Sequence, residues 1–126
     1  MEQEVVIGIV KKDDKVLMVK RAKTEGKLVW AFPGGKVEAD ETKEQACTRE
    51  IKEETGITVA IIKEIGSRFH PNTARRITYF LCKYIEGEPI TVDTSEILEV
   101  TFKSKEEFER DVATDVFPAV LTELSW

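Results

Sequence analysis

Residues 35–57 constrain the fold of this 126-residue chain more than any other part of it, because they predict one well-delimited helix. Thr42 and Gln45 have the spacing of a capping box, in which each side chain accepts a hydrogen bond from the backbone of the other residue. The segment Lys43–Thr55 contains neither glycine nor proline, and Gly56 stands where a left-handed residue often ends a helix. The sequence therefore predicts a helix over Lys43–Thr55.

Three glutamates on this predicted helix stand at positions i, i+3 and i+4, so Glu50, Glu53 and Glu54 should share one face. Carboxylates this close repel one another by roughly a few tenths of a kcal/mol per pair unless a cation binds among them. Oxygen ligands without a nearby His or Cys suit a hard divalent ion, which indicates magnesium, with manganese as the alternative. The ordinary alternative for such a cluster is a solvated helix face.

The same stretch resembles the Nudix box at every specified position. The matching residues are Gly35, Glu41, Arg49, Glu50, Ile51, Glu53, Glu54, Gly56 and Ile57. The resemblance implies an enzyme with an α/β/α sandwich fold that hydrolyses a nucleoside diphosphate linked to another moiety. It also implies that Glu41 and Arg49 brace the loop against the helix and take no direct part in catalysis.

The resemblance assigns the metal and the chemistry to the clustered glutamates. Glu50 and Glu54 are expected to bind the metal directly, and Glu53 to act as a further ligand or to position a water molecule. The backbone carbonyl of Gly35 is expected to complete the metal shell. All three glutamates are therefore candidate catalytic residues.

A fourth glutamate from another loop often joins the site in this family, six residues before an aromatic residue. Glu96 lies six residues before Phe102 and is the candidate for this role, with Glu99 as the second choice. The family usually carries a tryptophan at the aromatic position, so Phe102 is a departure from the pattern. The general base is left open between Glu53 and Glu96.

Outside the helix, runs of β-branched and aromatic residues separated by turn residues predict short strands. The predicted strands are residues 5–10, 16–20, 28–32, 36–38, 57–65, 76–85 and 99–102. A second capping box begins at Ser104, and Pro118 suits the first turn of a terminal helix with Phe117, Leu121 and Leu124 on its apolar face. Together these elements indicate an α/β domain with a mixed sheet between helical layers.

Several residues outside the helix are candidates for binding a phosphorylated substrate. Arg21, Arg68, His70 and Arg76 are interpreted as cations that hold phosphate charge not covered by the metal, and Lys20, Lys23 and Arg75 are further candidates. Phe32, with Phe69 as the alternative, is interpreted as a ring that stacks on a nucleobase in a pocket bounded by the first hairpin, residues 30–32 and the terminal helix. The ordinary alternatives are surface cations and a core ring.

Length and composition limit what else the chain can do. With 126 residues and 41% hydrophobic content, the sequence predicts one domain over residues 1–126, with Cys47 and Cys82 as free thiols. No stretch approaches 18 apolar residues and the amino terminus is acidic, which predicts a cytoplasmic protein with no membrane span. A net charge of −5 argues against binding polymeric nucleic acid but is compatible with a small nucleotide and a bridging metal. The sequence leaves monomer and homodimer open.

The resemblance leaves three functions to weigh. A (deoxy)nucleoside triphosphate pyrophosphohydrolase giving a nucleoside monophosphate and pyrophosphate is favoured, because the chain begins a short distance before the box, as in short MutT-like members. An ADP-ribose or dinucleoside polyphosphate hydrolase is the alternative, and Pro71 lies near a position where ADP-ribose hydrolases of the family tend to carry proline. A non-catalytic nucleotide-sensing domain is the second alternative, which the intact glutamates disfavour.

Overall fold

The structure is a computed structural model that describes residues 3–22, 28–70, 75–91, 97–112 and 116–126. Within these residues it contains a seven-stranded sheet and three helices. The strands are β1 (Gln3–Lys12), β2 (Lys15–Ala22), β3 (Leu28–Ala31), β4 (Gly34–Lys36), β5 (Thr58–Phe69), β6 (Arg75–Glu86) and β7 (Ile97–Lys103). The helices are α1 (Lys43–Thr55), α2 (Lys105–Asp111) and α3 (Pro118–Leu124).

The strands pair in the order β3-β2-β1-β6-β5, with β4 paired to β1 and β7 paired to β2. β1 runs parallel to β6, which places Val5 beside Ile77 and Ile7 beside Tyr79. The other pairs of strands are antiparallel. The sheet is therefore mixed, which confirms the predicted fold class.

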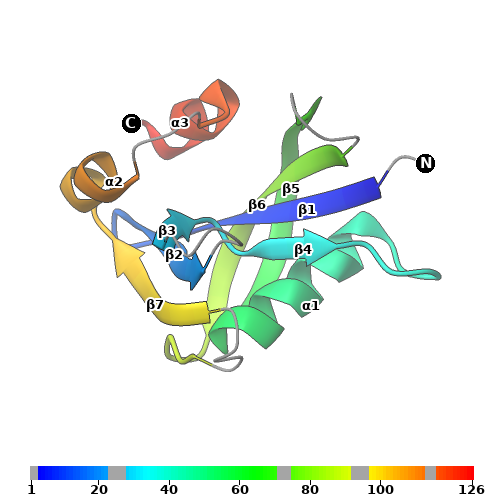
Figure 1. The fold of residues 1–126 in the computed structure, drawn as a ribbon, viewed down its shortest axis with the longest axis horizontal. Helices are drawn as coiled ribbons and strands as arrows, with labels where there is room; N and C mark the ends of the chain where they lie inside the picture. Colours follow the sequence, from blue (N-terminus) through cyan, green and yellow to red (C-terminus); the bar gives the residue numbers. More distant parts are fainter. Residues whose placement is uncertain (1–2, 23–27, 71–74, 92–96, 113–115) are drawn as a thin grey trace.

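Alternate side chains of β1 enter two different cores, because successive residues of a strand point to opposite faces of the sheet. Val6 and Val10 pack with Ile51 of α1, whereas Ile9 packs with Phe108 of α2 and with residues of α3. Figure 1 shows the same division, with α1 on one side of the sheet and α2 and α3 together on the other. The layers form an α/β/α sandwich.

Helix α1 begins and ends where the sequence predicts. The Thr42 hydroxyl accepts a hydrogen bond from the Gln45 backbone N–H at 3.0 Å, and the Gln45 side chain accepts one from the Thr42 backbone N–H at 2.8 Å. Gly56 closes the helix in a left-handed conformation, with φ of 77°. These local bonds set the length of the helix and hence the positions of its glutamates.

The helix lies unusually close to the sheet at Gly8 of β1. A Cβ atom at Gly8 would overlap the Ile51 side chain and crowd the Cys47 sulfur. Ile51, Cys47 and Ala46 are all fully buried, so the thin apolar stripe of α1 is compensated by this close approach. The Cys47 and Cys82 sulfurs lie 3.9 Å apart in the same core, and both thiols are free, as predicted.

Two details of the fold differ from the sequence prediction. The fourth strand is β4 (Gly34–Lys36) where residues 36–38 were expected, because the backbone of the glycine segment pairs with β1. At α3 the predicted residues Phe117, Leu121 and Leu124 all pack in the core, but Val120, which was not predicted, is fully buried with Leu124, and Phe117 and Leu121 are half-buried. Among the described helices, none is long and apolar enough to cross a membrane.

Candidate active site

The three glutamates of α1 differ in their exposure to solvent. The side chains of Glu50 and Glu54 are 17% and 13% exposed, and that of Glu53 is 58% exposed. Glu50 and Glu54 therefore lie against the rest of the protein, while Glu53 stands at the rim of the cluster. The helix geometry alone places all three on neighbouring turns.

Glu54 is held by two groups from the sheet. The Arg21 guanidinium donates through Nη2 to Oε2 of Glu54 at 2.7 Å, and the Gly34 backbone N–H donates to Oε1 at 2.8 Å. Burial raises the pKa of Glu54 above its ordinary value, while the positive charge of Arg21 and the Gly34 hydrogen bond oppose that rise. Both carboxylate oxygens are thus engaged by donors from β2 and β4.

Arg49 joins the loop before α1 to the helix. Its guanidinium binds both oxygens of Glu41, with Nε to Oε2 at 3.0 Å and Nη2 to Oε1 at 2.7 Å. The same side chain donates to the Lys36 carbonyl at 3.1 Å, and Glu41 also accepts from the Glu38 backbone N–H at 2.8 Å. The Arg49 hydrogen bonds are the largest cause of a Glu41 pKa of about 2.

Glu50 lies between Arg49 and residues 33–35 at the start of β4, which form the glycine loop. Arg49 Nη1 donates to Oε1 of Glu50 at 2.9 Å and to Oε2 of Glu53 at 3.1 Å. Burial raises the pKa of Glu50, and the Arg49 hydrogen bond opposes the rise. A Cβ atom at Gly35 would overlap the Glu50 carboxylate, so only glycine allows this contact.

The donor chemistry of the cluster fits a hard divalent ion, because its oxygens come from carboxylates beside a backbone loop. In the part of the chain that the structure describes, no group of three carboxylate, thiol or imidazole side chains is arranged so that it could hold a metal ion. Arginine side chains instead bind oxygens of Glu50 and Glu54. Glu96 lies outside the described residues, and Glu99 is exposed on β7 opposite Lys20.

A cationic pocket of about 540 Å³ adjoins the glycine loop. Its basic lining residues are Arg21, Lys36, His70 and Arg75. Arg21 and His70 were candidates from the sequence, but Arg76 is not brought to this pocket. The Arg76 guanidinium lies 5.4 Å from the centre of the Phe69 ring, and Arg75 lines the pocket in its place.

An apolar pocket of about 190 Å³ lies beside the cationic one. It is larger than the roughly 150 Å³ apolar cavity that admits benzene, so it can accept an aromatic ring. The two pockets share four lining residues, Ile7, Ala31, Phe32 and Ile77, and are therefore adjacent.

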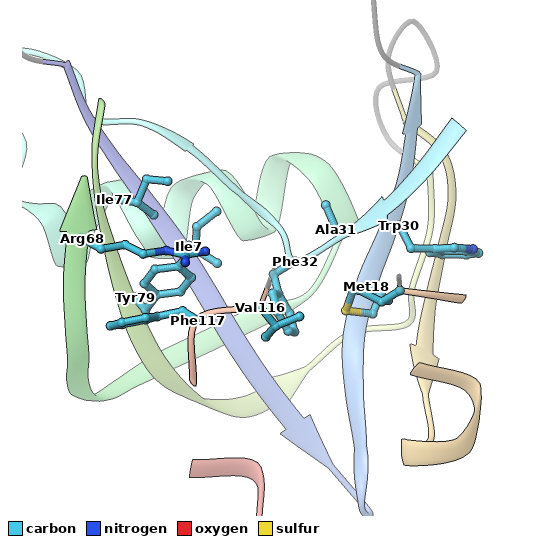
Figure 2. Close-up of a pocket in the computed structure, with 11 residues that line it drawn as sticks. Ile7, Met18, Trp30, Ala31, Phe32, Arg68, Ile77, Tyr79, Val116 and Phe117 are labelled. Atoms are coloured by element: carbon cyan, nitrogen blue, oxygen red, sulfur yellow. The ribbon is translucent and has the colours of Figure 1, made fainter. Parts of the chain in front are cut away.

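Aromatic side chains and one arginine shape the apolar pocket (Figure 2). Figure 2 shows Arg68 extending from β5 toward Ile7, with the Tyr79 and Phe117 rings alongside it. The guanidinium carbon lies 5.9 Å from the centre of Tyr79 and 5.3 Å from that of Phe117. Trp30 and Phe32 belong to the same lining, whereas Arg68, a candidate for holding phosphate, lies in the apolar pocket and not in the cationic one.

A model of the NUDIX domain family matches residues 1–121 of the sequence. The chain belongs to the Nudix family. The predicted family and fold class are therefore confirmed, and hydrolases of this family generally use divalent metal ions.

Three known proteins place this Nudix chain among its relatives. It is 45% identical over 67 residues to an ADP-ribose pyrophosphatase of Methanocaldococcus jannaschii, a match that covers 53% of this chain and 40% of that protein. It is 42% identical over 65 residues to a CTP pyrophosphohydrolase of Escherichia coli, covering 51% and 48%. The matches thus span less than half of each relative. A solved NUDIX hydrolase from Nitrosomonas europaea has the same fold, with a TM-score of 0.82, 24% identity, and coverage of 99% and 87%.

Some residues of the Nudix site could not be selected from the sequence pattern. Lys36 and Tyr79 line the pockets but were not among the candidates. Alternation along β6 is the signal that links Tyr79 to the candidate Arg75, because residues two apart point to one face. Trp30 belongs to the segment expected to bound the base pocket, and Phe117 directly precedes the terminal helix expected to bound it.

Proposed function

We propose that this protein hydrolyses a (deoxy)nucleoside triphosphate to the nucleoside monophosphate and pyrophosphate, with a divalent metal ion bound at α1. The observation that carries the proposal is the adjacency of three regions. An apolar pocket lies beside a cationic pocket, and the cationic pocket borders the glycine loop that touches Glu50 and Glu54. A base, a polyphosphate chain and a metal ion need these three environments in that order.

The apolar pocket supports the assignment of the base. Its aromatic walls offer stacking surfaces, and base stacking on such rings is tolerant of base identity. Arg68 adds hydrogen-bond donors in an otherwise apolar lining, which suits the acceptor atoms on the edge of a base. The base would therefore be held by its faces and oriented by one edge.

The cationic pocket supports the assignment of the phosphates. Arg21 and Arg75 carry planar guanidinium groups that match phosphate oxygens in geometry, and Lys36 and His70 lie in the same lining. These side chains would hold the outer phosphates while the glutamates face the scissile bond. The negative charge that makes a polyphosphate resistant to water is thus offset from both sides.

Glu50 and Glu54, with the Gly35 carbonyl, would hold the metal, for which we propose magnesium with manganese as the alternative. When bound, the ion supplies charge neutralisation and lowers the pKa of a water molecule. Glu53 is the most exposed of the three carboxylates and can accept a proton from the attacking water. The general base remains a choice between Glu53 and Glu96.

ADP-ribose hydrolysis is the second candidate function. It is favoured by the identity of 45% to the ADP-ribose pyrophosphatase of M. jannaschii over 67 residues. Both candidates place an aromatic base and a diphosphate in the same two pockets. They differ in the group beyond the second phosphate, which is a phosphate in one and a ribose in the other.

We further propose that residues 1–126 form one domain that acts in the cytoplasm on a small nucleotide, as a monomer or a homodimer. The family match over residues 1–121 supports a single domain. The net charge of −5 disfavours polymeric nucleic acid as the substrate.

The proposed function is tested by magnesium-dependent hydrolysis of one panel of substrates with products identified by ³¹P NMR. The panel contains the common (d)NTPs, 8-oxo-dGTP, ADP-ribose and a dinucleoside polyphosphate. Pyrophosphate with a nucleoside monophosphate is the expected result, and AMP with ribose 5-phosphate would establish the second candidate. Tight nucleotide binding without turnover would contradict both and identify a nucleotide sensor.

A further inference from the structure

Arg21 connects the proposed metal site to the proposed phosphate site. Its Nη2 donates to Glu54 Oε2 at 2.7 Å, and the same side chain lines the cationic pocket. Glu54 is 13% exposed, and its second oxygen accepts from the Gly34 N–H at 2.8 Å. One guanidinium therefore stands between a carboxylate that should bind a metal and a pocket that should hold phosphates.

A guanidinium and a metal ion compete for Glu54. Both are cations, so placing them on the same carboxylate oxygen is opposed by their mutual repulsion. The structure describes the guanidinium-bound arrangement, and its described residues contain no group of three carboxylates that could hold a metal ion. The Arg21 contact takes one of the acceptor sites of Oε2, so it opposes metal binding through Glu54.

Arg21 has an alternative partner within its reach. Phosphate oxygens match the guanidinium fork as well as a carboxylate does, and the pocket that Arg21 lines is the one assigned to phosphates. A substrate phosphate can therefore stabilise the side chain once it has left Glu54. Loss of one ion pair is then offset by formation of another.

We propose that Arg21 exchanges Glu54 for a substrate phosphate when the metal binds, and so couples metal binding to nucleotide binding. The inference rests on the proposed function, because it takes Glu54 as a metal ligand and the cationic pocket as the phosphate site. Coupling of this kind is reciprocal, so nucleotide should tighten metal binding by the factor by which metal tightens nucleotide binding. Arg21 is then a positioning residue that pairs with Glu54 in the empty site and releases it when substrate arrives.

The test is the affinity of the full chain for Mn²⁺, followed by electron paramagnetic resonance of the free ion. Each titration is made with and without a non-hydrolysable α,β-methylene nucleoside triphosphate. For Arg21→Gln, we expect Mn²⁺ alone to bind about tenfold more tightly than to the wild type, because a charged competitor has been removed. After the Mn²⁺ that the nucleotide binds in solution is subtracted, the nucleotide should tighten Mn²⁺ binding by a larger factor in the wild type than in Arg21→Gln, where only direct contact of the metal with the phosphates remains.

Arg75→Gln is the matched control, since Arg75 lines the same pocket from β6. It should weaken nucleotide binding while leaving the affinity for Mn²⁺ alone close to that of the wild type. If Arg21→Gln does not fold, Arg21→Lys provides the measurement, because lysine keeps the charge but not the fork. Without nucleotide, the Mn²⁺ affinity of Arg21→Lys should lie between that of the wild type and that of Arg21→Met, which lacks the charged competitor.

The sign of the change decides the proposal. Equal or weaker Mn²⁺ binding by Arg21→Gln, with the nucleotide effect intact, would overturn it and make the Arg21–Glu54 pair purely structural. That result would leave the proposed function standing if the wild type hydrolyses a member of the substrate panel. A wild type that neither binds Mn²⁺ nor hydrolyses any substrate would overturn both.

Discussion

The Arg49 guanidinium binds both carboxylate oxygens of Glu41, at 3.0 and 2.7 Å, across the junction between the loop and α1. The pair is largely shielded, with side chains 24% and 15% exposed. Two parallel charge-assisted hydrogen bonds fix the relative orientation of the guanidinium and the carboxylate as well as their separation. The loop that carries Gly35 is thereby held in one position relative to Glu50.

This pair predicts an acid-dependent loss of stability. The Glu41 pKa is about 2 in the folded protein and 4.5 in its ordinary state, so folding favours the ionised form. The contribution is complete above pH 4.5 and is lost as the pH falls toward 2. We therefore compare the urea midpoints of unfolding of the wild type and Glu41→Gln, measured in EDTA from pH 7 to pH 2. The difference between the two midpoints should disappear at the acid end of this range. Glu64→Gln, on the exposed edge of β5, is the control, and a pH-independent gap for Glu41→Gln would contradict the prediction.

Glu53→Gln should remove activity without affecting the fold. The side chain is 58% exposed and stands away from both cores, so the thermal midpoint should stay near that of the wild type. Loss of a general base or a metal ligand should lower kcat by about 10²- to 10⁴-fold. Glu44→Gln, on an exposed position of the same helix, should retain activity. Full activity in Glu53→Gln would exclude the proposed role of this carboxylate.

Gly8→Ala should destabilise the docking of α1 on the sheet. The new methyl group would overlap Ile51, and overpacking of this kind costs about 1–3 kcal/mol. Ile51→Val in the same protein should recover part of the loss, because it removes the methyl group that the alanine meets. Urea denaturation of both single variants and the double variant measures this coupling. Simple addition of the two losses would show that the clash is relieved elsewhere.

Phe117→Ala should weaken substrate binding more than catalysis. Phe117 forms one wall of the apolar pocket, and loss of one stacking surface raises KM by about ten- to a hundredfold. The value of kcat should change little, because stacking is the same in the bound substrate and the transition state. Ile62→Ala, which alters an exposed residue of β5, should leave KM unchanged. A fall in kcat at constant KM would place Phe117 in a different role.

Local signals account for the part of the fold that the sequence predicted best. Helix α1 has the predicted limits because the Thr42–Gln45 capping box and Gly56 act within a few residues. Strand pairing is different, since the parallel contact of β1 with β6 joins residues far apart in the chain. Neither strand carries a local signal for its partner, and β4 became a strand only through its pairing with β1.

The same distinction applies to the candidate site. The glutamates could be placed on one face because helix geometry is regular, and the candidates Arg21 and Phe32 line the cationic pocket. The choice of Arg76 over Arg75 depended on which face of β6 each residue occupies, and strand register decides that. The hydrogen bond between Arg21 and Glu54 could not be predicted from the sequence, because the two residues are 33 positions apart.

The central position of β1 has a consequence for synthesis of the chain. β1 precedes the other strands, yet one of its edges pairs with β6, from Arg75 to Lys83. Until that segment leaves the ribosome, an apolar strand keeps an open edge that can pair with other chains. Fragments ending before β6 should therefore aggregate, and the wild-type chain should complete its sheet late because these contacts are so distant in sequence.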